Sequence, residues 1–283
     1  MQIAIITKLI NNTKFKIDKG DHLLDTHTHI LWNIDDGSKN QCMSLQMLEI
    51  AARSGTKAIF ATPHVIERAN KPSWEEIKEK TQQLRQLCAE AQIDIMLYPG
   101  AEVQMNWELL PELGATGAYC LNGGRYLLVE LPAAEIPAYA DEFWYELELK
   151  GIMPILAHPE RYQQLRENPD LLLLWRRRGM LMQCNSGSFT GMFGSSVCEN
   201  AKVLLANGLV DLLGSDGRRT QYGYVTGSGG HQAAGRRRST AADDRNEPAG
   251  DLKKSGNRAQ AAQSIFRRQT KELLAETLWQ IIN

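Results

Sequence analysis

The sequence predicts an α/β protein in which parallel strands, joined by helices, close into a barrel. The chain has 283 residues, which is enough for one large domain with a single core. Short runs of strand-forming residues alternate with helical stretches over residues 22–216. Histidines and carboxylates stand at the ends of these runs, and a closed parallel barrel gathers its strand ends on one rim. These three observations favour the barrel.

Seven runs in this region read as strands. They are HLLDTHTH at 22–29, TKAIFATPH at 56–64, IDIMLYPGAE at 93–102, RYLLVELP at 125–132, IMPILAHPER at 152–161, MLMQCNSGS at 180–188 and LVDLLGSD at 209–216. Nearly continuous apolar runs separated by helices are typical of a parallel sheet that is buried on both faces. An open doubly wound sheet shares this alternation, but it would spread the seven ends along a line. A closed barrel brings them together, so we prefer it.

Two helices have clear boundary signals. Ser73 followed three residues later by Glu76 is a capping box, and it predicts a helix from there to about Gln92. The sequence Asn168-Pro169-Asp170 predicts the start of a second helix that ends before Gly179.

The two ends of the chain differ from this repeating region. We expect residues 1–21 to form an N-terminal arm. Residues 217–264 contain eight glycines and few large apolar side chains, so we expect a flexible segment there. Residues 265–283 predict a C-terminal helix whose apolar stripe is Leu273, Leu274, Leu278 and Ile281.

Composition argues against a disordered, a collagen-like or a disulfide-stabilised protein. Apolar residues make up 43% of the chain and charged residues 23%, as in an ordinary globular protein. We find neither a long apolar run nor a secretory signal, and therefore predict a cytoplasmic protein without membrane insertion. Residues 217–283 carry 12 basic and 6 acidic side chains, which leaves 20 basic and 27 acidic in residues 1–216. An acidic body does not suggest binding to nucleic acid.

The cysteines argue against thiol chemistry. The chain has five of them, widely spaced and without a C-x-x-C pair, so neither a disulfide framework nor a thiolate zinc site is indicated. No cysteine has an arginine six positions later, so a phosphate-binding loop around a thiolate nucleophile is also missing.

The pair His27 and His29 points to a metal site. Residues two apart on a strand face the same side, so the two imidazoles can bind one ion. A pair of half-buried histidines without a ligand role is the alternative. This alternative is disfavoured because five of the six histidines, with Glu102, Glu130 and Asp216, lie near predicted strand ends.

Histidine and carboxylate ligands without thiolate suit Mn²⁺, Fe²⁺ or Zn²⁺. Such a cluster makes hydroxide from water at neutral pH and holds the oxygens of a phosphoryl group. Arg161, three residues after His158, is placed to bind a phosphate dianion. The alternative for Arg161 is a surface salt bridge with Glu160 or Glu167.

Taken together, these motifs resemble a known family. They are Asp25-Thr26-His27-Thr28-His29, Ile34-Asp35-Asp36-Gly37, Ala61-Thr62-Pro63-His64, Pro99-Gly100-Ala101-Glu102, Leu128-Val129-Glu130, Ala157-His158-Pro159-Glu160-Arg161 and Gly214-Ser215-Asp216. Over residues 22–216 the chain is similar to the bacterial PHP-type (polymerase and histidinol phosphatase) protein-tyrosine phosphatases of capsule and exopolysaccharide operons. The resemblance implies a distorted (β/α)7 barrel of the PHP superfamily with up to three metal ions and manganese-dependent activity.

The resemblance also implies roles for particular residues. The metal ligands would be His27, His29, Asp36, His64, Glu102, Glu130, His158 and Asp216. Arg161 resembles the phosphate-binding arginine of the family, and we place it with Asp216 in the catalytic machinery. The implied substrate is the phosphorylated C-terminal tyrosine cluster of a partner autokinase, through which family members regulate polymer export.

The resemblance ends at the seventh strand. The family pattern continues Ser-Asp-x-His, whereas this chain has Ser215-Asp216-Gly217-Arg218 and lacks the last histidine. We therefore expect a weakened metal site, and we interpret residues 217–264 as the product of a shifted reading frame. Two other functions stay open, namely a small-molecule phosphoesterase of the histidinol-phosphatase type and a catalytically dead regulatory barrel.

Overall fold

The computed structural model of the protein describes residues 23–114 and 117–219. The predicted arm at 1–21, nearly all of the segment at 217–264 and the predicted helix at 265–283 lie outside the described residues. Among the described helices, none has the length and apolar character needed to cross a membrane.

Nine strand segments carry the described part of the fold. They are β1 (Leu23–Thr28), β2 (Thr56–Ala61), β3 (His64–Val65), β4 (Met96–Pro99), β5 (Glu102–Gln104), β6 (Tyr126–Glu130), β7 (Met153–Ala157), β8 (Leu181–Asn185) and β9 (Leu212–Gly214). All pair in parallel, in the orders β1-β2-β4 and β3-β5-β6-β7-β8-β9. Each of the seven predicted strand runs contains at least one of these segments.

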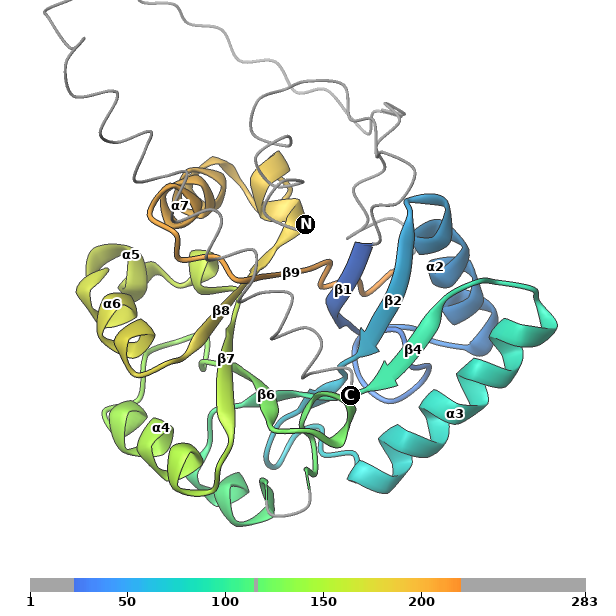
Figure 1. The fold of residues 1–283 in the computed structure, drawn as a ribbon, viewed down its shortest axis with the longest axis horizontal. Helices are drawn as coiled ribbons and strands as arrows, with labels where there is room; N and C mark the ends of the chain where they lie inside the picture. The colour runs from blue at the N-terminus through green and yellow to red at the C-terminus, as the bar shows by residue number, and fades with distance from the viewer. Residues whose placement is uncertain (1–22, 115–116, 220–283) are drawn as a thin grey trace, which may run out of the picture.

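The two sheets join into one curled sheet. β2 leads directly into β3 and β4 into β5, and hydrogen bonds cross the break between them. The Gly100 N–H donates to Ala61 O at 3.0 Å, and the Glu102 N–H donates to Pro63 O at 3.0 Å. At the other side Gly217 forms a parallel bridge to Thr28, which brings the end of β9 against β1. The predicted α/β fold with parallel strands is therefore confirmed, and its sheet is curled (Figure 1).

Six α-helices connect the described strands. They are α2 (Gln41–Arg53), α3 (Trp74–Glu90), α4 (Ala140–Leu149), α5 (Gln163–Glu167), α6 (Asp170–Arg177) and α7 (Ser195–Ala206). Short 3-10 helices are η1 (Trp107–Glu112), η2 (Leu121–Gly123), η3 (Pro159–Arg161) and η4 (Ser186–Thr190). The described part of the connection from β5 to β6 has only 3-10 turns, since Pro111 and four glycines between residues 107 and 124 disfavour an α-helix.

Both predicted helix starts are confirmed. Ser73 is the N-cap of α3, and its side chain accepts a hydrogen bond from the Glu76 N–H at 3.1 Å. α6 begins at Asp170, directly after Pro169, and ends two residues before Gly179. The sequence signals therefore located these helices to within about one turn.

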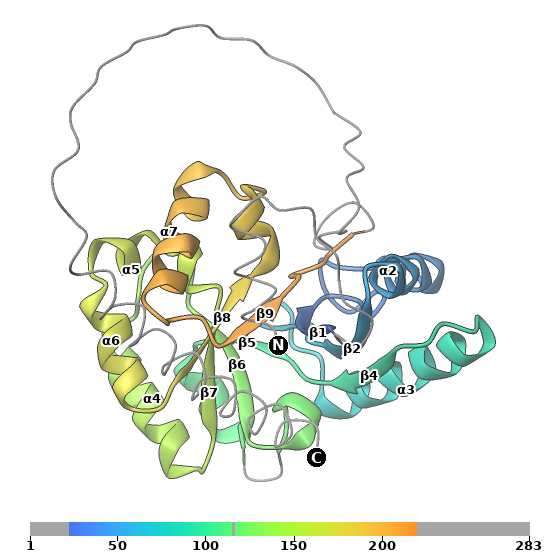
Figure 2. The same ribbon diagram turned by 45° about the horizontal axis from the view of Figure 1, so that its top comes forward.

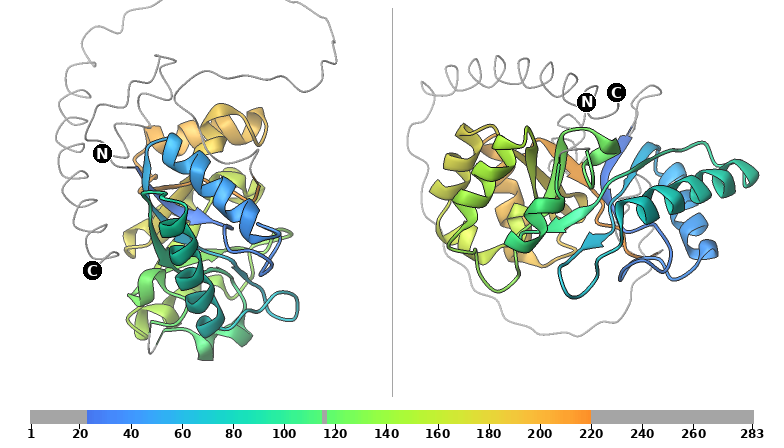
Figure 3. Two further views of the ribbon diagram at one scale, coloured as in Figure 1. Left: turned by 90° about the vertical axis from the view of Figure 1, so that its right-hand side faces the viewer. Right: turned by 90° about the horizontal axis from the view of Figure 1, so that it is seen from below.

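The helices surround the curled sheet. α2 and α3 cover one flank beside β1, β2 and β4, while α4, α5, α6 and α7 lie outside β6 to β9 (Figure 1). The turned view shows α2 and α3 side by side, opposite α4 and α6 (Figure 2). Seen from below, the strands lie between these two groups of helices (Figure 3).

The strands have two different faces. In β6, Leu127 and Val129 belong to the large core between the sheet and the helices. Tyr126 and Leu128 belong to a smaller core inside the curl. Glu130 continues this inner row at the strand's carboxyl end. Since side chains alternate along a strand, the inner face changes from apolar to polar toward one edge of the sheet.

Strands β8 and β9 repeat this change. Leu181 packs on the inner core, and the inner row continues with the polar residues Gln183 and Asn185. In β9, Leu212 is followed on the inner side by Gly214. An apolar floor thus supports a polar upper layer, which is where the candidate site lies.

Gly214 is tightly packed in this layer, and it provides a test of the packing. A Cβ atom added there would lie 2.4 Å from the Cβ of His27 and 2.7 Å from Nε2 of Gln183. We expect Gly214→Ala to lower the free energy of unfolding by about 2–3 kcal/mol, since the neighbours must shift.

The control is Gly151→Ala, where an added Cβ has nothing within 4 Å and only the φ of +73° is unfavourable. It should cost about 1 kcal/mol. Both values come from urea unfolding followed by circular dichroism. An equal loss in the two variants would show that Gly214 is not tightly packed.

Candidate metal centre

The carboxyl edge of the curled sheet brings the predicted site residues together. Each of them contacts another member of the group at a hydrogen-bond or ion-pair distance. The group comprises His27, His29, Asp36, His64, Glu102, Glu130, His158, Arg161 and Asp216. Residues nearly 190 positions apart in the sequence therefore form one cluster.

Glu102, at the start of β5, lies at the centre of the cluster and is fully buried. Its Oε2 is 3.1 Å from Nε2 of His27 and 3.3 Å from Nε2 of His29. The same oxygen is 3.1 Å from Nδ1 of His64. Its Oε1 is 2.8 Å from Nε2 of His158. Four imidazoles from three parts of the sheet thus face one carboxylate.

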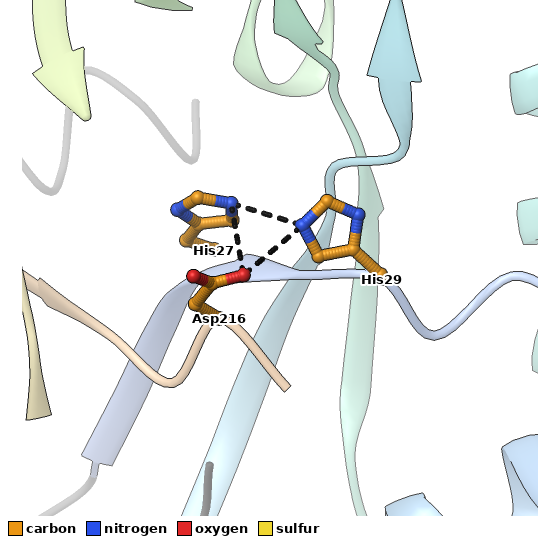
Figure 4. A group of neighbouring side chains, drawn as sticks. All are labelled: His27, His29 and Asp216. Atoms are coloured by element: carbon orange, nitrogen blue, oxygen red, sulfur yellow. Dashed lines mark hydrogen bonds and ion pairs between the residues drawn. The ribbon is translucent and has the colours of Figure 1, made fainter. Parts of the chain in front are cut away.

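Asp216 forms a second carboxylate contact with the histidine pair (Figure 4). Its Oδ1 is 3.3 Å from Nε2 of His29 and 3.9 Å from Nε2 of His27, and these two nitrogens are 3.2 Å apart. The side chains point toward one another from β1 and from the chain just after β9. Asn185 and Arg161 donate to Oδ2 of Asp216 at 2.9 Å and 2.8 Å.

The cluster fits a divalent metal. Glu102 Oε2, His64 Nδ1 and His158 Nδ1 are buried atoms without a hydrogen-bond partner among the described residues. Buried polar atoms of this kind need an explanation, and a bound ion is one. Ligands about 2.0–2.2 Å from one ion lie about 3.0–3.5 Å from each other, which matches the separations around Glu102. Four groups of three residues bring potential ligand atoms within 4.8 Å of one another. They are His27 with His29 and Asp216, His27 with Glu102 and His158, His29 with His64 and Glu102, and His29 with Asp35 and Asp36.

Hydrogen bonds at the Nδ1 atoms orient the rings of His27 and His29. Nδ1 of His27 is 3.0 Å from Oε1 of Gln183, and Nδ1 of His29 is 2.7 Å from Oδ2 of Asp35. Because both partners are acceptors, each Nδ1 carries a hydrogen and the neutral ring presents the lone pair of Nε2 to the cluster. Partners of this kind fix the orientation of metal-binding histidines.

The two aspartates of the Asp35-Asp36-Gly37 sequence have different roles. The side chain of Asp35 is buried, and it also accepts hydrogen bonds from the backbone N–H groups of Gly37 and His64 at 2.9 Å and 3.0 Å. Asp36, predicted as a ligand, has a side chain that is 57% exposed and lies at the edge of the cluster, 3.7 Å from Nε2 of His64.

Charge and burial oppose each other in the cluster. Burial disfavours a charged Glu102, yet the positive charge of His27 and a hydrogen bond from His158 hold the pKa of its carboxyl well below the usual range. Burial also disfavours protonation of His29, but hydrogen bonds to Asp216 and Asp35 raise its pKa well above the usual value. Cations are therefore strongly favoured in this pocket.

Arg161 lies at the rim of the cluster. Its guanidinium pairs with Asp216 and lies 5.1 Å from the ring centre of Phe193. The alternative salt bridge with Glu160 is not formed, because the Glu160 carboxylate is buried and accepts hydrogen bonds from the Asn185 N–H and the Ser188 hydroxyl. Arg161 therefore faces the site.

Four residues that the sequence analysis did not assign to the site also contact the cluster, namely Asp35, Gln183, Asn185 and Arg218. Gln183 was missed although it lies two residues before Asn185 on the same strand face, which was the available signal. Asp36 was chosen over Asp35 because the family resemblance assigns the ligand role to the second aspartate, whereas the burial of Asp35 becomes known only with the loop geometry.

His158 and Asp216 have left-handed backbone conformations, with φ values of +35° and +51°. Such conformations are uncommon for residues other than glycine, and they concentrate where a site imposes them. His158 directly follows β7 and Asp216 lies two residues after β9, and the turn of the backbone directs their side chains to the cluster.

The fold and the site together define an α/β protein that carries a candidate metal centre at the carboxyl edge of a curled parallel sheet. The chain belongs to the capsular polysaccharide synthesis family CpsB/CapC, whose family model matches residues 23–223. The family predicted from the motifs is thus confirmed.

Its relatives are tyrosine-protein phosphatases. The chain is 34% identical over 194 residues to the tyrosine-protein phosphatase YwqE of Bacillus subtilis, covering 69% of this chain and 76% of YwqE. It is 28% identical to the tyrosine-protein phosphatase CpsB of Streptococcus pneumoniae, covering 69% and 82%. Crystal structures of YwqE and CpsB, described as unique metal-dependent tyrosine phosphatases, include a chain that matches with a TM-score of 0.66 and 31% identity, covering 72% of this chain and 83% of that one.

The ligand assignment can be tested by metal content. We expect His27→Ala and His29→Ala to lose most of the bound Mn²⁺ while keeping the circular dichroism spectrum of the fold. Asp35→Asn should lower the affinity for Mn²⁺ by about 10- to 100-fold, since it weakens the partner that orients His29. Asp94→Asn, at an exposed surface pair with Lys57, is the control. Unchanged metal content in both histidine variants would disprove the assignment.

Proposed function

We propose that this chain is a metal-dependent protein-tyrosine phosphatase that acts on a tyrosine autokinase of polysaccharide synthesis. The observation that carries the proposal is the buried Glu102 carboxylate, whose Oε2 lies 3.1 Å and 3.3 Å from Nε2 of His27 and His29 and has no hydrogen-bond partner among the described residues. The tyrosine-phosphatase relatives support the choice of phosphotyrosine as substrate.

The residues that would hold the metal are His27, His29, Asp36, His64, Glu102, Glu130, His158 and Asp216. We propose Mn²⁺ as the ion, with Fe²⁺ and Zn²⁺ as alternatives that the same ligands accept, and up to three ions. When bound, a divalent ion neutralises charge on phosphoryl oxygens and lowers the pKa of water.

A cavity of about 780 Å³ opens beside the cluster and suits an aryl phosphate. Its polar lining includes His64, Glu130, His158, Arg161 and Arg218, and its apolar lining includes Ile66, Leu131, Pro132, Ile136 and Tyr162. In our proposal the phosphate lies at the polar side and the tyrosyl ring contacts the apolar side. Arg161 binds the phosphate oxygens through its planar pair of N–H groups.

We also propose that the fold is the distorted (β/α)7 barrel implied by the family resemblance. Seven strands result when β2 with β3 and β4 with β5 are each counted as one broken strand. Residues 22–216 would then form the barrel domain. The interpretation of residues 217–264 as a shifted reading frame stays a prediction, and the nucleotide sequence of the locus tests it.

The substrate is tested by comparing a phosphotyrosine peptide with histidinol phosphate, both with Mn²⁺. We expect turnover of the peptide at least tenfold faster, because the apolar side of the cavity fits an aromatic ring. Faster turnover of histidinol phosphate would indicate a small-molecule phosphoesterase. Peptide binding without turnover of either compound would indicate a regulatory barrel.

The role of Arg161 is tested by substitution. Arg161→Ala should lower kcat by about 10²- to 10³-fold, since it removes a charge that stabilises the transferring phosphoryl group, while the Mn²⁺ content stays constant. The kcat of Arg161→Lys should lie between those of wild type and Arg161→Ala, because lysine keeps the charge but not the planar pair of donors. Arg178→Ala, at a separate surface pair with Asp141, is the control. Loss of metal together with activity would instead make Arg161 a structural residue.

Hydrolysis should proceed without a covalent phosphoenzyme. Cys184 is fully buried, and burial raises the pKa of its thiol well above the usual value. Burial likewise raises the pKa of Cys120 to about 12, so neither thiol supplies a thiolate at neutral pH. Iodoacetamide should therefore leave activity unchanged, whereas a chelator should abolish it until Mn²⁺ is restored. Inactivation by iodoacetamide that substrate prevents would reverse this assignment.

A further inference from the structure

Arg218 contacts three members of the candidate metal centre at once. Its Nε donates to Oδ1 of Asp216 at 3.0 Å, and its Nη1 lies 2.9 Å from Nε2 of His64. The same Nη1 forms an ion pair with Oδ2 of Asp36. Two carboxylates and an imidazole that converge in this way would otherwise present acceptor atoms to a cation.

The backbone that carries Arg218 is fixed. Gly217, the residue before it, forms the parallel bridge to Thr28 and accepts a hydrogen bond from the His29 N–H at 3.0 Å. The Gly217 N–H donates to the hydroxyl of Ser215 at 3.0 Å. The side chain of Arg218 is 27% exposed. The hydrogen-bonded backbone at Gly217 therefore holds the Arg218 side chain in the cluster rather than in solvent.

Arg218 also uses the nitrogen through which His64 could bind an ion on this side. A guanidinium has only donors, so Nε2 of His64 must be the acceptor. A neutral imidazole with an accepting Nε2 carries its hydrogen on Nδ1. While Arg218 is in place, neither nitrogen of His64 therefore offers a lone pair to a metal, so His64 leaves the ligand set of the proposed function.

Electrostatics also argues against a metal ion at the atoms that Arg218 contacts. Five carboxylates meet at the site, from Asp35, Asp36, Glu102, Glu130 and Asp216, and a cation is needed to balance them. Arg218 supplies one positive charge between Asp36 and Asp216. A divalent ion placed at the same atoms would be repelled by the guanidinium at contact distance.

We infer that Arg218 is a built-in cation that takes the place of one metal ion between Asp36, His64 and Asp216. The remaining ion or ions bind on the Glu102 side, next to His27, His29 and His158. This inference rests on the metal centre of the proposed function, and it predicts that the chain binds one ion fewer than its ligand set would otherwise allow.

The experiment counts metal ions in the full chain. Wild-type protein, Arg218→Ala and Arg218→Lys are stripped with chelator, reloaded with Mn²⁺ and dialysed. Ions per chain are measured by plasma mass spectrometry, and binding is followed by the electron paramagnetic resonance signal of free Mn²⁺. Arg219→Ala, at the exposed neighbouring position, is the control. Thermal unfolding checks that each variant is folded.

We expect Arg218→Ala to bind one more Mn²⁺ per chain than wild type, whereas Arg218→Lys and Arg219→Ala match wild type. If Arg218→Ala does not fold, Arg218→Gln replaces it under the same criterion, since it removes the charge but keeps a polar side chain. Equal, nonzero numbers of Mn²⁺ per chain in wild type and the uncharged variant would overturn the inference. Fewer ions in the uncharged variant than in wild type would also overturn it. Absence of bound Mn²⁺ from wild type and all variants would instead overturn the metal centre itself.

Discussion

The candidate site depends on burying the carboxylate of Glu102 completely. Removing an isolated carboxylate from water is very unfavourable, so the surrounding structure has to supply compensating groups. Here these groups are four imidazoles from β1, from the start of β3 and from the residue after β7. No single strand could provide them. The curl of the sheet is therefore a condition for the site, since only converging strand ends bring the four rings around one carboxylate.

The contact between β9 and β1 holds the two ends of this arrangement together. The Asp216 N–H donates to His27 O at 2.9 Å, and Oδ1 of Asp25 accepts from the backbone N–H groups of His27 and Ser215. Burial raises the pKa of Asp25 to about 6, against the lowering effect of these hydrogen bonds. The acidic residue of the Asp25-Thr26-His27 sequence thus serves the backbone contact, which places Asp216 beside the histidine pair.

Much of the fold and the cluster could be predicted from the sequence, because both follow from regular repeats. Alternating strand and helix signals located all seven strand runs, and polar residues at strand ends had to meet once the strands converged. What could not be predicted depends on irregular backbone. The loop after His29 decides that Asp35 is buried while Asp36 is exposed, and two strand breaks divide the ladder at Thr62-Pro63 and Gly100-Ala101. The sequence showed Arg218 at the position of the missing family histidine, but its three contacts become visible only in the structure.

Asp216 is shared by two arginines, and this sets their different roles. Its Oδ2 accepts from Arg161, and its Oδ1 accepts from Arg218. A phosphate dianion that enters the cavity competes with Asp216 for both guanidinium groups. Arg161 has one carboxylate partner among the described residues, and its side chain is 36% exposed. Arg218 has two carboxylate partners and is less exposed, so it gives up its contacts less readily. In the function proposed here, the same carboxylate would therefore leave Arg161 free to bind substrate while it keeps Arg218 as a fixed charge of the site.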